Sequence, residues 1–209
     1  MHGQSFFVFF LGFRGFSMMK RFLIMLAAAA VLAGSGCVEP VVFAEVFQLR
    51  KDQKIYTACN IWYTDPENID CRNIQQGSFI PVGTEIEPVG TDEWSEKITF
   101  KAAGKTFSIR FDNGIRLCSM RDYIEETFTT STRDELFKDI PDKARIRIVR
   151  GEVVPGMDRR QVLLAFGAPA AVRTPDRKNE TWIYWVSDSK TIRLVFRGDI
   201  VRKIISVDL

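Results

Sequence analysis

The clearest hydrophobic pattern in the chain begins at Gly156 and predicts a short helix. Asp158 stands where an N-cap belongs, and Gln161 follows three residues later as in a capping box. Apolar residues then recur at helical spacing as far as Phe166. Gly167 favours a left-handed helix end, and the proline two residues later prevents the helix from continuing.

Three strand patterns follow this helix. Residues 181–187 are rich in aromatic and β-branched side chains, and residues 191–197 alternate between two kinds of side chain, largely apolar on one face and basic on the other. Gly198-Asp199 has the sequence of a two-residue hairpin turn and leads into residues 200–207. The pattern predicts a short helix packed on one face of a three-stranded antiparallel meander, which is an α+β architecture.

The middle of the chain, residues 46–118, has the pattern of a small β-barrel. Short runs of strand-forming residues are separated by turns that contain Gly, Pro, Asp and Asn. Trp62 and Tyr63, together with Trp94, either line a recognition groove on this barrel or plug its end.

Two short helices are predicted between these two parts. Residues 120–128 and 133–140 each follow a Ser or Thr that has an acidic residue three positions later, and we expect both helices to cover the C-terminal sheet. Residues 143–150 alternate basic and apolar side chains and fit either a helix or a strand. The expected organisation is a signal peptide (1–36), a tether (37–45), a β module (46–118) and an α+β module (119–209).

Four motifs of the C-terminal part follow one another in a definite order. They are a Gly-Met helix start in Gly156–Leu163, a Gly-x-Pro helix stop in Phe166–Pro169, a Trp-x-Tyr strand in Trp182–Trp185 and a Phe-x-x-Gly hairpin in Val195–Val201. Together they resemble the SmpA/OmlA (BamE-like) family of small bacterial outer-membrane lipoproteins. The resemblance implies a helix-on-meander fold, a position on the inner leaflet of the outer membrane, and the β-barrel assembly machinery as partner.

A second resemblance concerns the middle module. Residues 79–86, followed by residues 97–100 and 105–107, resemble bacterial SH3-like barrels. The resemblance implies a small SH3-like β-barrel that precedes the BamE-like module.

The N-terminus has the features of an export signal. Lys20 and Arg21 precede twelve apolar residues, Phe22–Ala33, and Met18 or Met19 is the expected start. Twelve helical residues span about 18 Å, whereas the hydrocarbon core of a bilayer is about 30 Å thick. This run is therefore interpreted as the core of a signal peptide and not as a membrane span.

Two processing sites are compatible with this signal. The small residues before Cys37 resemble the bacterial lipobox, which implies a palmitate-bearing lipid on Cys37 and an outer-membrane lipoprotein that faces the periplasm. Cleavage by an ordinary signal peptidase after Ala44 would instead release a soluble periplasmic protein.

Export to the periplasm permits disulfide formation. Cys59 and Cys71 close a loop of 13 residues that is rich in turn formers, and a bridge there would contribute about 3 kcal/mol. Cys118 is expected to be a buried free thiol. The histidine of the chain, His2, lies in the segment that export removes, so the mature chain has no residue set for Cys/His or Ser/His catalysis or for a zinc site. No enzyme activity, cofactor or metal is predicted.

Charge is distributed unevenly along the chain. Residues 37–142 hold 12 Lys and Arg against 19 Asp and Glu, whereas residues 143–209 hold 14 against 7. Either the two halves complement each other, or the basic half faces anionic lipid or an acidic partner. No basic run is interleaved with aromatic residues in a way that indicates nucleic-acid binding.

The tryptophans of the first C-terminal strand leave a similar choice. Trp182 and Trp185 lie on opposite faces of that strand, so one faces the covering helix and the other is either buried between modules or exposed for docking. The predicted function is that of a non-enzymatic envelope lipoprotein, a binding or scaffold subunit in outer-membrane protein assembly or envelope integrity. The alternative is a soluble periplasmic SH3-like module that binds or inhibits a cell-wall, peptide or enzyme ligand.

Overall fold

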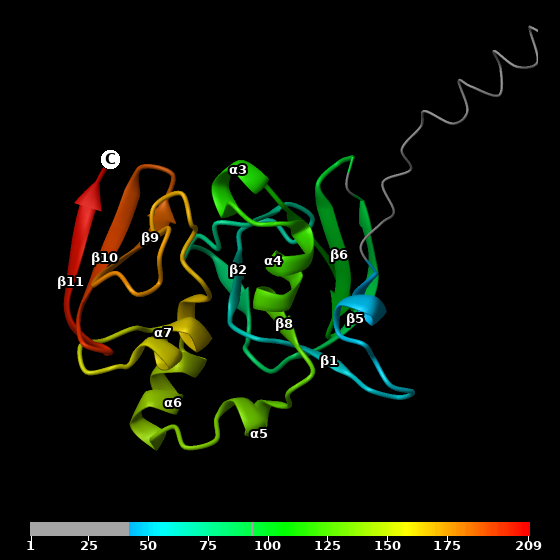
Figure 1. Ribbon diagram of the computed structural model, residues 1–209, viewed down its shortest axis with the longest axis horizontal. Helices are drawn as coiled ribbons and strands as arrows, with labels where there is room; N and C mark the ends of the chain where they lie inside the picture. Colours follow the sequence, from blue (N-terminus) through cyan, green and yellow to red (C-terminus); the bar gives the residue numbers. More distant parts are fainter. Residues whose placement is uncertain (1–41, 93) are drawn as a thin grey trace, which may run out of the picture. The chain divides into compact units, whose positions relative to one another are not determined.

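The computed structural model describes residues 42–92 and 94–209, which form an α+β fold (Figure 1). The predicted signal peptide, its start at Met18 or Met19, and Cys37 lie outside the described residues. Two hydrophobic clusters organise the described chain, one built mainly from residues 43–128 and the other mainly from residues 137–204. We call them the first and the second cluster.

The strands of the first cluster form two sheets. The larger sheet has the spatial order β3 (Ile69–Asp70), β7 (Lys105–Arg110), β6 (Lys97–Ala102), β5 (Glu85–Asp92), β1 (Ile55–Thr57) and β8 (Phe128–Thr129). Its neighbouring strands are antiparallel except for β3 and β7, which are parallel. The smaller sheet pairs β2 (Ile61–Tyr63) with β4 (Ser78–Ile80).

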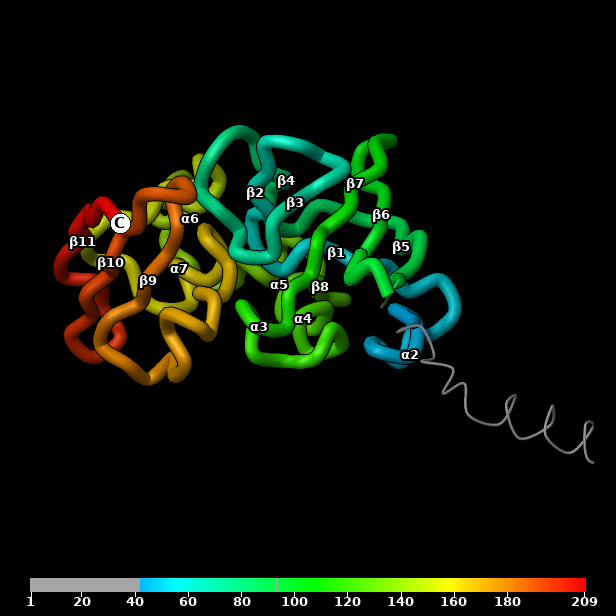
Figure 2. The backbone as a smooth tube through the Cα atoms, turned by 90° about the horizontal axis from the view of Figure 1, so that it is seen from above, coloured from blue at the N-terminus to red at the C-terminus, as the bar shows by residue number. Residues whose placement is uncertain are grey.

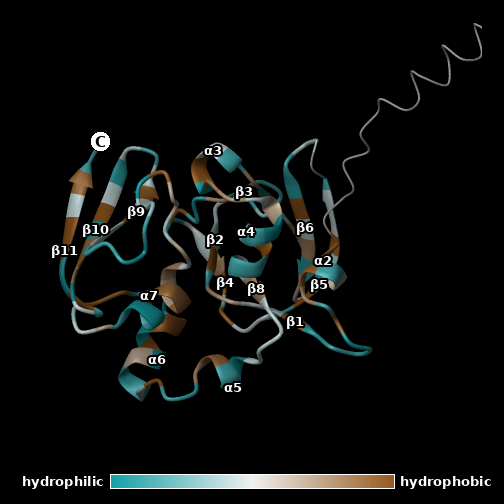
Figure 3. Cartoon of the chain, in the orientation of Figure 1, coloured by the Kyte–Doolittle hydropathy of each residue, from teal (hydrophilic) through white to brown (hydrophobic). Residues whose placement is uncertain are grey.

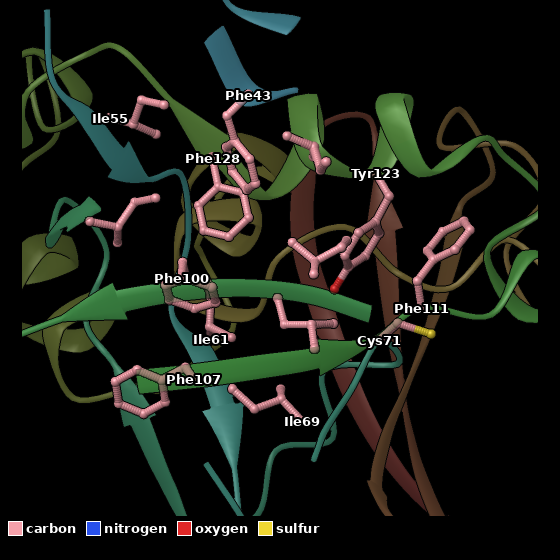
Figure 4. Close-up of a cluster of buried hydrophobic side chains, with 14 of the residues drawn as sticks. Phe43, Ile55, Ile61, Ile69, Cys71, Phe100, Phe107, Phe111, Tyr123 and Phe128 are labelled. Atoms are coloured by element: carbon pink, nitrogen blue, oxygen red, sulfur yellow. The ribbon is translucent and has the colours of Figure 1, made fainter. Parts of the chain in front are cut away.

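Aromatic rings fill the interior of the first cluster (Figure 4). The ring of Phe128 lies 5.1 Å from that of Phe100 and 5.3 Å from that of Phe43. Phe43 belongs to α2 (Phe43–Val46) and is buried. Part of the segment predicted as a tether, residues 37–45, is therefore a helical turn that packs in the core.

One of the two connecting helices packs differently from the prediction. Helix α4 (Met120–Thr127) begins at a capping box, as predicted, but Tyr123 and Ile124 point into the first cluster. The strand that follows it, β8, pairs with β1. The expectation that this helix covers the C-terminal sheet is wrong, because its buried residues belong to the first cluster. Short helices α3 (Asn113–Arg116) and α5 (Arg133–Leu136) complete the connection.

The predicted helix and meander are present in the C-terminal part. Asp158 and Gln161 form a capping box at the start of α7 (Arg159–Phe166), and Gly167 ends the helix at a φ of 73°. The antiparallel sheet has the order β11 (Ile200–Asp208), β10 (Lys190–Arg197) and β9 (Thr181–Ser187). Strand β10 contains both hydrophobic and hydrophilic residues (Figure 3), and its buried Leu194 and Phe196 lie on one face. Residues 142–149 form a helix, α6 (Asp142–Val149), which decides between the two predicted alternatives.

The second cluster lies between α7 and one face of this sheet. Val162 and Ala165 of the helix pack with Trp182, Leu194 and Phe196 of the strands. In both views of the backbone, α7 lies between the C-terminal sheet and β2 (Figures 1 and 2).

Two buried asparagines connect the clusters. The side-chain amide of Asn60 donates to the carbonyl oxygens of Ile148 (2.8 Å) and Ala165 (3.1 Å), and its oxygen accepts from the backbone N–H of Val82 (2.8 Å). The amide of Asn73 donates to the carbonyl oxygens of Asn60 and of Phe166, the last residue of α7. Both helices α6 and α7 are thereby fixed to the first cluster.

Candidate binding site

The aromatic pair predicted for binding, Trp62 and Tyr63, lies in β2 and is only half-exposed. The indole of Trp62 packs against Phe79 with ring centres 4.6 Å apart, and it also covers Gly151, where an added Cβ would lie 2.5 Å from its Cζ2. Tyr63 meets the edge of Phe107 at 5.3 Å. Both rings therefore contribute to packing. The indole N–H of Trp62 is buried and has no hydrogen-bond partner among the described residues.

A polar cleft of about 250 Å³ lies beside these two rings. Arg72 in its wall contacts Asp70 at 2.7 Å and Asp188 at 2.9 Å, and Arg110 approaches Asp70 at 3.7 Å. Partial burial acts to raise the pKa of Asp70, but the hydrogen bonds and charge of Arg72 outweigh it, and the pKa lies below its ordinary value. The charges of this cleft largely neutralise one another.

Neither Trp182 nor Trp185 is on the surface. Trp182 is 1% exposed in the second cluster, and its indole N–H donates to the carbonyl oxygen of Arg177 at 3.0 Å. Trp185, on the opposite face, is 6% exposed between the guanidinium groups of Arg72 (5.6 Å) and Arg173 (5.8 Å). Of the two predicted alternatives, the structure therefore shows burial for both indoles, and neither is exposed for docking. By contrast, Trp94 is 90% exposed in the turn between β5 and β6.

The cysteines of the described residues, Cys59, Cys71 and Cys118, are free thiols. The predicted Cys59–Cys71 bridge is therefore absent from this structure, although both residues line one small cavity of about 20 Å³. Burial raises the pKa of Cys59 and of Cys71 to about 12, so both thiols stay protonated at neutral pH. Cys118 is more exposed, but burial raises its pKa as well.

The same cavity is lined by Arg116, which is 5% exposed. Its guanidinium group donates to Glu126 at 2.8 Å and to the carbonyl oxygen of Ala168 at 3.2 Å. Glu126 also pairs with Arg177. This charged group joins α4 to the loop after α7, and its partners give it a structural role.

The largest surface depression of these three is a groove of about 500 Å³ beside α6, which we call the α6 groove. It is lined by Pro141, Lys143, Ala144, Ile146, Arg147 and Arg150 of α6 and its ends, by residues 154–157, and by Gln161 of α7. Ile148 is the buried residue of α6, and it anchors the helix in the second cluster.

Besides Ile148, Ala144 is partly buried against the second cluster, and the other side chains of α6 face outward. Ile146 is 52% exposed in the groove, and Val149 is 40% exposed next to it. Arg147 pairs with Glu152, whereas Lys143 and Arg150 form no ion pair within the described residues. The groove therefore offers apolar surface and unpaired positive charge together.

This groove could not be identified from the amino-acid sequence alone. The sequence feature that corresponds to the groove is the alternation of basic and apolar residues over 143–150. This pattern indicates a binding surface only once the segment is known to be a helix that buries Ile148.

No family model, curated protein or solved structure matches this chain. Of the helices described, none has the length and apolar character needed to cross a membrane. His, Cys, Asp and Glu side chains in the described ranges nowhere gather in groups of three or more that could hold a metal ion.

Proposed function

We propose that this protein is an exported envelope lipoprotein, anchored through Cys37, that acts as a non-enzymatic binding or scaffold subunit. The α6 groove carries the proposal, because it places exposed apolar side chains beside two cations, Lys143 and Arg150, that form no ion pair with any residue the structure describes, on a helix fixed to both clusters. Such a surface suits an acidic segment of a partner protein that also has apolar side chains.

The recognition would use two kinds of contact. Ile146 and Val149 bury apolar surface of the partner, which supplies affinity. Lys143 and Arg150 attract its carboxylates, which speeds association and selects against basic segments. The excess of basic over acidic residues in 143–209 extends this attraction beyond the groove.

The arrangement of the C-terminal part supports the resemblance to SmpA/OmlA (BamE-like) proteins at the level of fold. The capping box at Asp158, the helix stop at Gly167 and the buried Trp182 lie where a helix-on-meander fold requires them. By this resemblance the expected partners are the inner leaflet of the outer membrane, through the lipid, and other envelope assembly proteins. The first cluster is proposed to be an SH3-like module.

The lipid anchor is tested by growing cells that express the full-length chain with labelled palmitate. Label on the wild-type chain in the outer-membrane fraction, and its loss in Cys37→Ala, are the expected results. A wild-type chain that is unlabelled and soluble in the periplasm contradicts the anchor.

The groove is tested by affinity capture from solubilised envelope with the double variant Lys143→Glu/Arg150→Glu. The matched control is Lys101→Glu/Lys105→Glu, which makes the same change of net charge at exposed residues of the β6–β7 hairpin. We expect partner recovery to fall about tenfold in the groove variant, which corresponds to about 1.4 kcal/mol, and to change little in the control. Equal losses in the two variants would show that only net charge matters.

The alternative function, a soluble periplasmic SH3-like binding or inhibitor module, is favoured by one observation. The indole N–H of Trp62 has no hydrogen-bond partner among the described residues, and Trp62 lines the polar cleft together with Tyr63 and Arg72. A soluble, unlabelled chain whose ligand binding is lost in Tyr63→Ala and kept in the groove variant would support this alternative.

A further inference from the structure

Strand β11 is the outer strand of the C-terminal sheet and has β10 on one side only (Figure 1). The first two residues of its outer edge are covered by the segment before α7. Ile200 forms a bridge with Asp158, and the carbonyl oxygen of Val201 accepts from Gly156 at 2.8 Å. Beyond Val201 the outer edge has no such neighbour within the described ranges.

The ladder determines which backbone groups of this edge point outward. The N–H of Leu209 donates to the carbonyl oxygen of Ser189 at 2.8 Å, so residue 209 faces β10. Since antiparallel strands alternate between inward and outward groups, residues 207, 205 and 203 also face β10. The N–H and C=O groups of Ile204, Ser206 and Asp208 therefore point away from the sheet, with no backbone partner in the described part of the chain.

The opposite edge of the same sheet, formed by β9, is covered by other segments of the chain. On β9 the outward N–H of Ile183 donates to the hydroxyl oxygen of Thr174 at 3.0 Å, and the carbonyl oxygen of Trp185 accepts from Gln75 at 3.0 Å. The fold thus closes one edge with its own loops and leaves the other open. Unpaired edge groups of this kind are a template for another strand.

The side chains along the open edge also suit a paired strand. Ile205 and Val207 lie on the sheet face opposite α7 and are partly exposed, and their partners on β10 are Arg193 and Thr191. Lys203 is exposed on the same face. The edge is mainly apolar over its second half and carries its positive charge near the covered end.

We propose that β11 pairs antiparallel with β11 of a second copy of this chain, with Ser206 on the two-fold axis. In such a pairing, the outward N–H and C=O groups of one strand must lie opposite the outward groups of the other. When Ser206 lies opposite the partner's Ser206, Ile204 lies opposite the partner's Asp208, and the outward groups of all three residues are hydrogen-bonded in both copies. Ile205 then lies opposite the partner's Val207, and the converse pair forms on the other side of the axis.

This register explains why a second copy fits better than an unrelated strand. The apolar pair at positions 205 and 207 forms twice about the two-fold axis, and Ile200 and Val201, which Asp158 and Gly156 cover, take no part in the pairing of residues 204–208. The result is one continuous sheet across both copies, with the apolar side chains of Val195, Ile205 and Val207 on a common face.

The test uses the full-length chain, purified in detergent, with sedimentation and amide hydrogen exchange measured over a range of protein concentrations. We expect the mass to approach twice that of one chain at high concentration. Over the same range the amides of Ile204, Ser206 and Asp208 should exchange at least about tenfold more slowly, whereas those of Ile205 and Val207, already bonded to β10, should not change. A chain that stays monomeric, or a dimer without this alternating protection, overturns the proposal.

Two variants and a control separate pairing from folding. Ser206→Pro removes an outward N–H that β10 does not use, so the strand tolerates it while the two-fold contact loses hydrogen bonds. Ser206→Thr keeps that N–H and should still dimerise. Ile205→Lys places cations on both sides of the axis and should give monomers by a second route. If the Ser206→Pro chain still dimerises, pairing with a second copy is contradicted. The same holds if the amides of Ile204 and Ser206 exchange slowly only when another protein is bound to the chain.

Discussion

Replacing Asn60 with alanine tests how the two clusters are joined. The side chain is fully buried and makes the hydrogen bonds to Val82, Ile148 and Ala165 described above. An alanine at this position removes all three bonds and brings in no group that replaces them. We expect the variant to fold but to be substantially less stable than the wild type.

The expected loss follows from the groups left without partners. The carbonyl oxygen of Ile148 keeps a second bond, from the N–H of Gly151 at 2.9 Å. The N–H of Val82 and the carbonyl oxygen of Ala165 have no other backbone partner among the described residues. An orphaned buried group costs about 1–3 kcal/mol, so Asn60→Ala should lower the free energy of unfolding by about 2–6 kcal/mol.

The measurement is urea unfolding, followed by tryptophan fluorescence and by far-ultraviolet circular dichroism. The control is Asn68→Ala, at an exposed asparagine whose backbone N–H donates to the carbonyl oxygen of Asp65, and it should change stability by less than about 0.5 kcal/mol. A similarly small change for Asn60→Ala would refute the reasoning, because the amide would then contribute no more than a surface group.

Two further predictions concern a close approach and a titration. Gly151→Ala should destabilise more than Gly104→Ala: both glycines have positive φ (66° and 76°), but only at Gly151 would the new Cβ meet a ring, that of Trp62 at 2.5 Å. Because Arg72 holds the pKa of Asp70 below its ordinary value, the stability that Asp70 contributes is present above the unfolded pKa of about 3.9 and is lost as pH falls through the folded pKa. Urea unfolding should therefore show Asp70→Asn less stable than the wild type at pH 6, with the difference shrinking towards pH 2.

Each of these predictions has a clear contrary result. Equal costs for the two glycine variants would mean that the backbone conformation alone matters and that the indole yields easily. A difference between wild type and Asp70→Asn that stays constant below pH 4 would mean that Asp70 has an ordinary pKa in the folded protein.

The C-terminal helix and meander could be predicted from sequence because their signals are local. The capping box at Asp158, the stop at Gly167 and the turn at Gly198 each act within a few residues. The alternation over 191–197 gave both the strand and the face that it buries. Short-range chemistry of this kind needs no knowledge of what lies elsewhere in the chain.

Long-range pairings were beyond such signals. Nothing local in Met120–Thr127 indicates that Tyr123 and Ile124 join the first cluster instead of packing on the sheet that comes later in the chain. The parallel pairing of β3 with β7 spans about forty residues and rests on two residues of β3. Both features depend on contacts that the sequence encodes only through the whole fold.

The residues of the candidate site likewise could not be predicted from local sequence signals. The sequence left open whether the aromatic residues pack or bind, and in the structure Trp182 and Trp185 are buried and Trp62 covers Gly151. The α6 groove depends on the packing of Ile148, which leaves Ile146 on the outside. Which of these two isoleucines is buried depends on how the helix is rotated against the cluster. The hydrophobic periodicity of an eight-residue helix does not determine that rotation.

The docking of α2 links the processing of the chain to its stability. A peptidase that cut after Ala44 would remove Phe43, whose ring packs on Phe128 at 5.3 Å and is 3% exposed. Loss of a buried phenylalanine side chain costs about 3–5 kcal/mol, a large share of the stability of a small domain. Maturation at Cys37 would keep that ring, so the thermal stability of the protein isolated from cells reports which of the two bonds was cleaved.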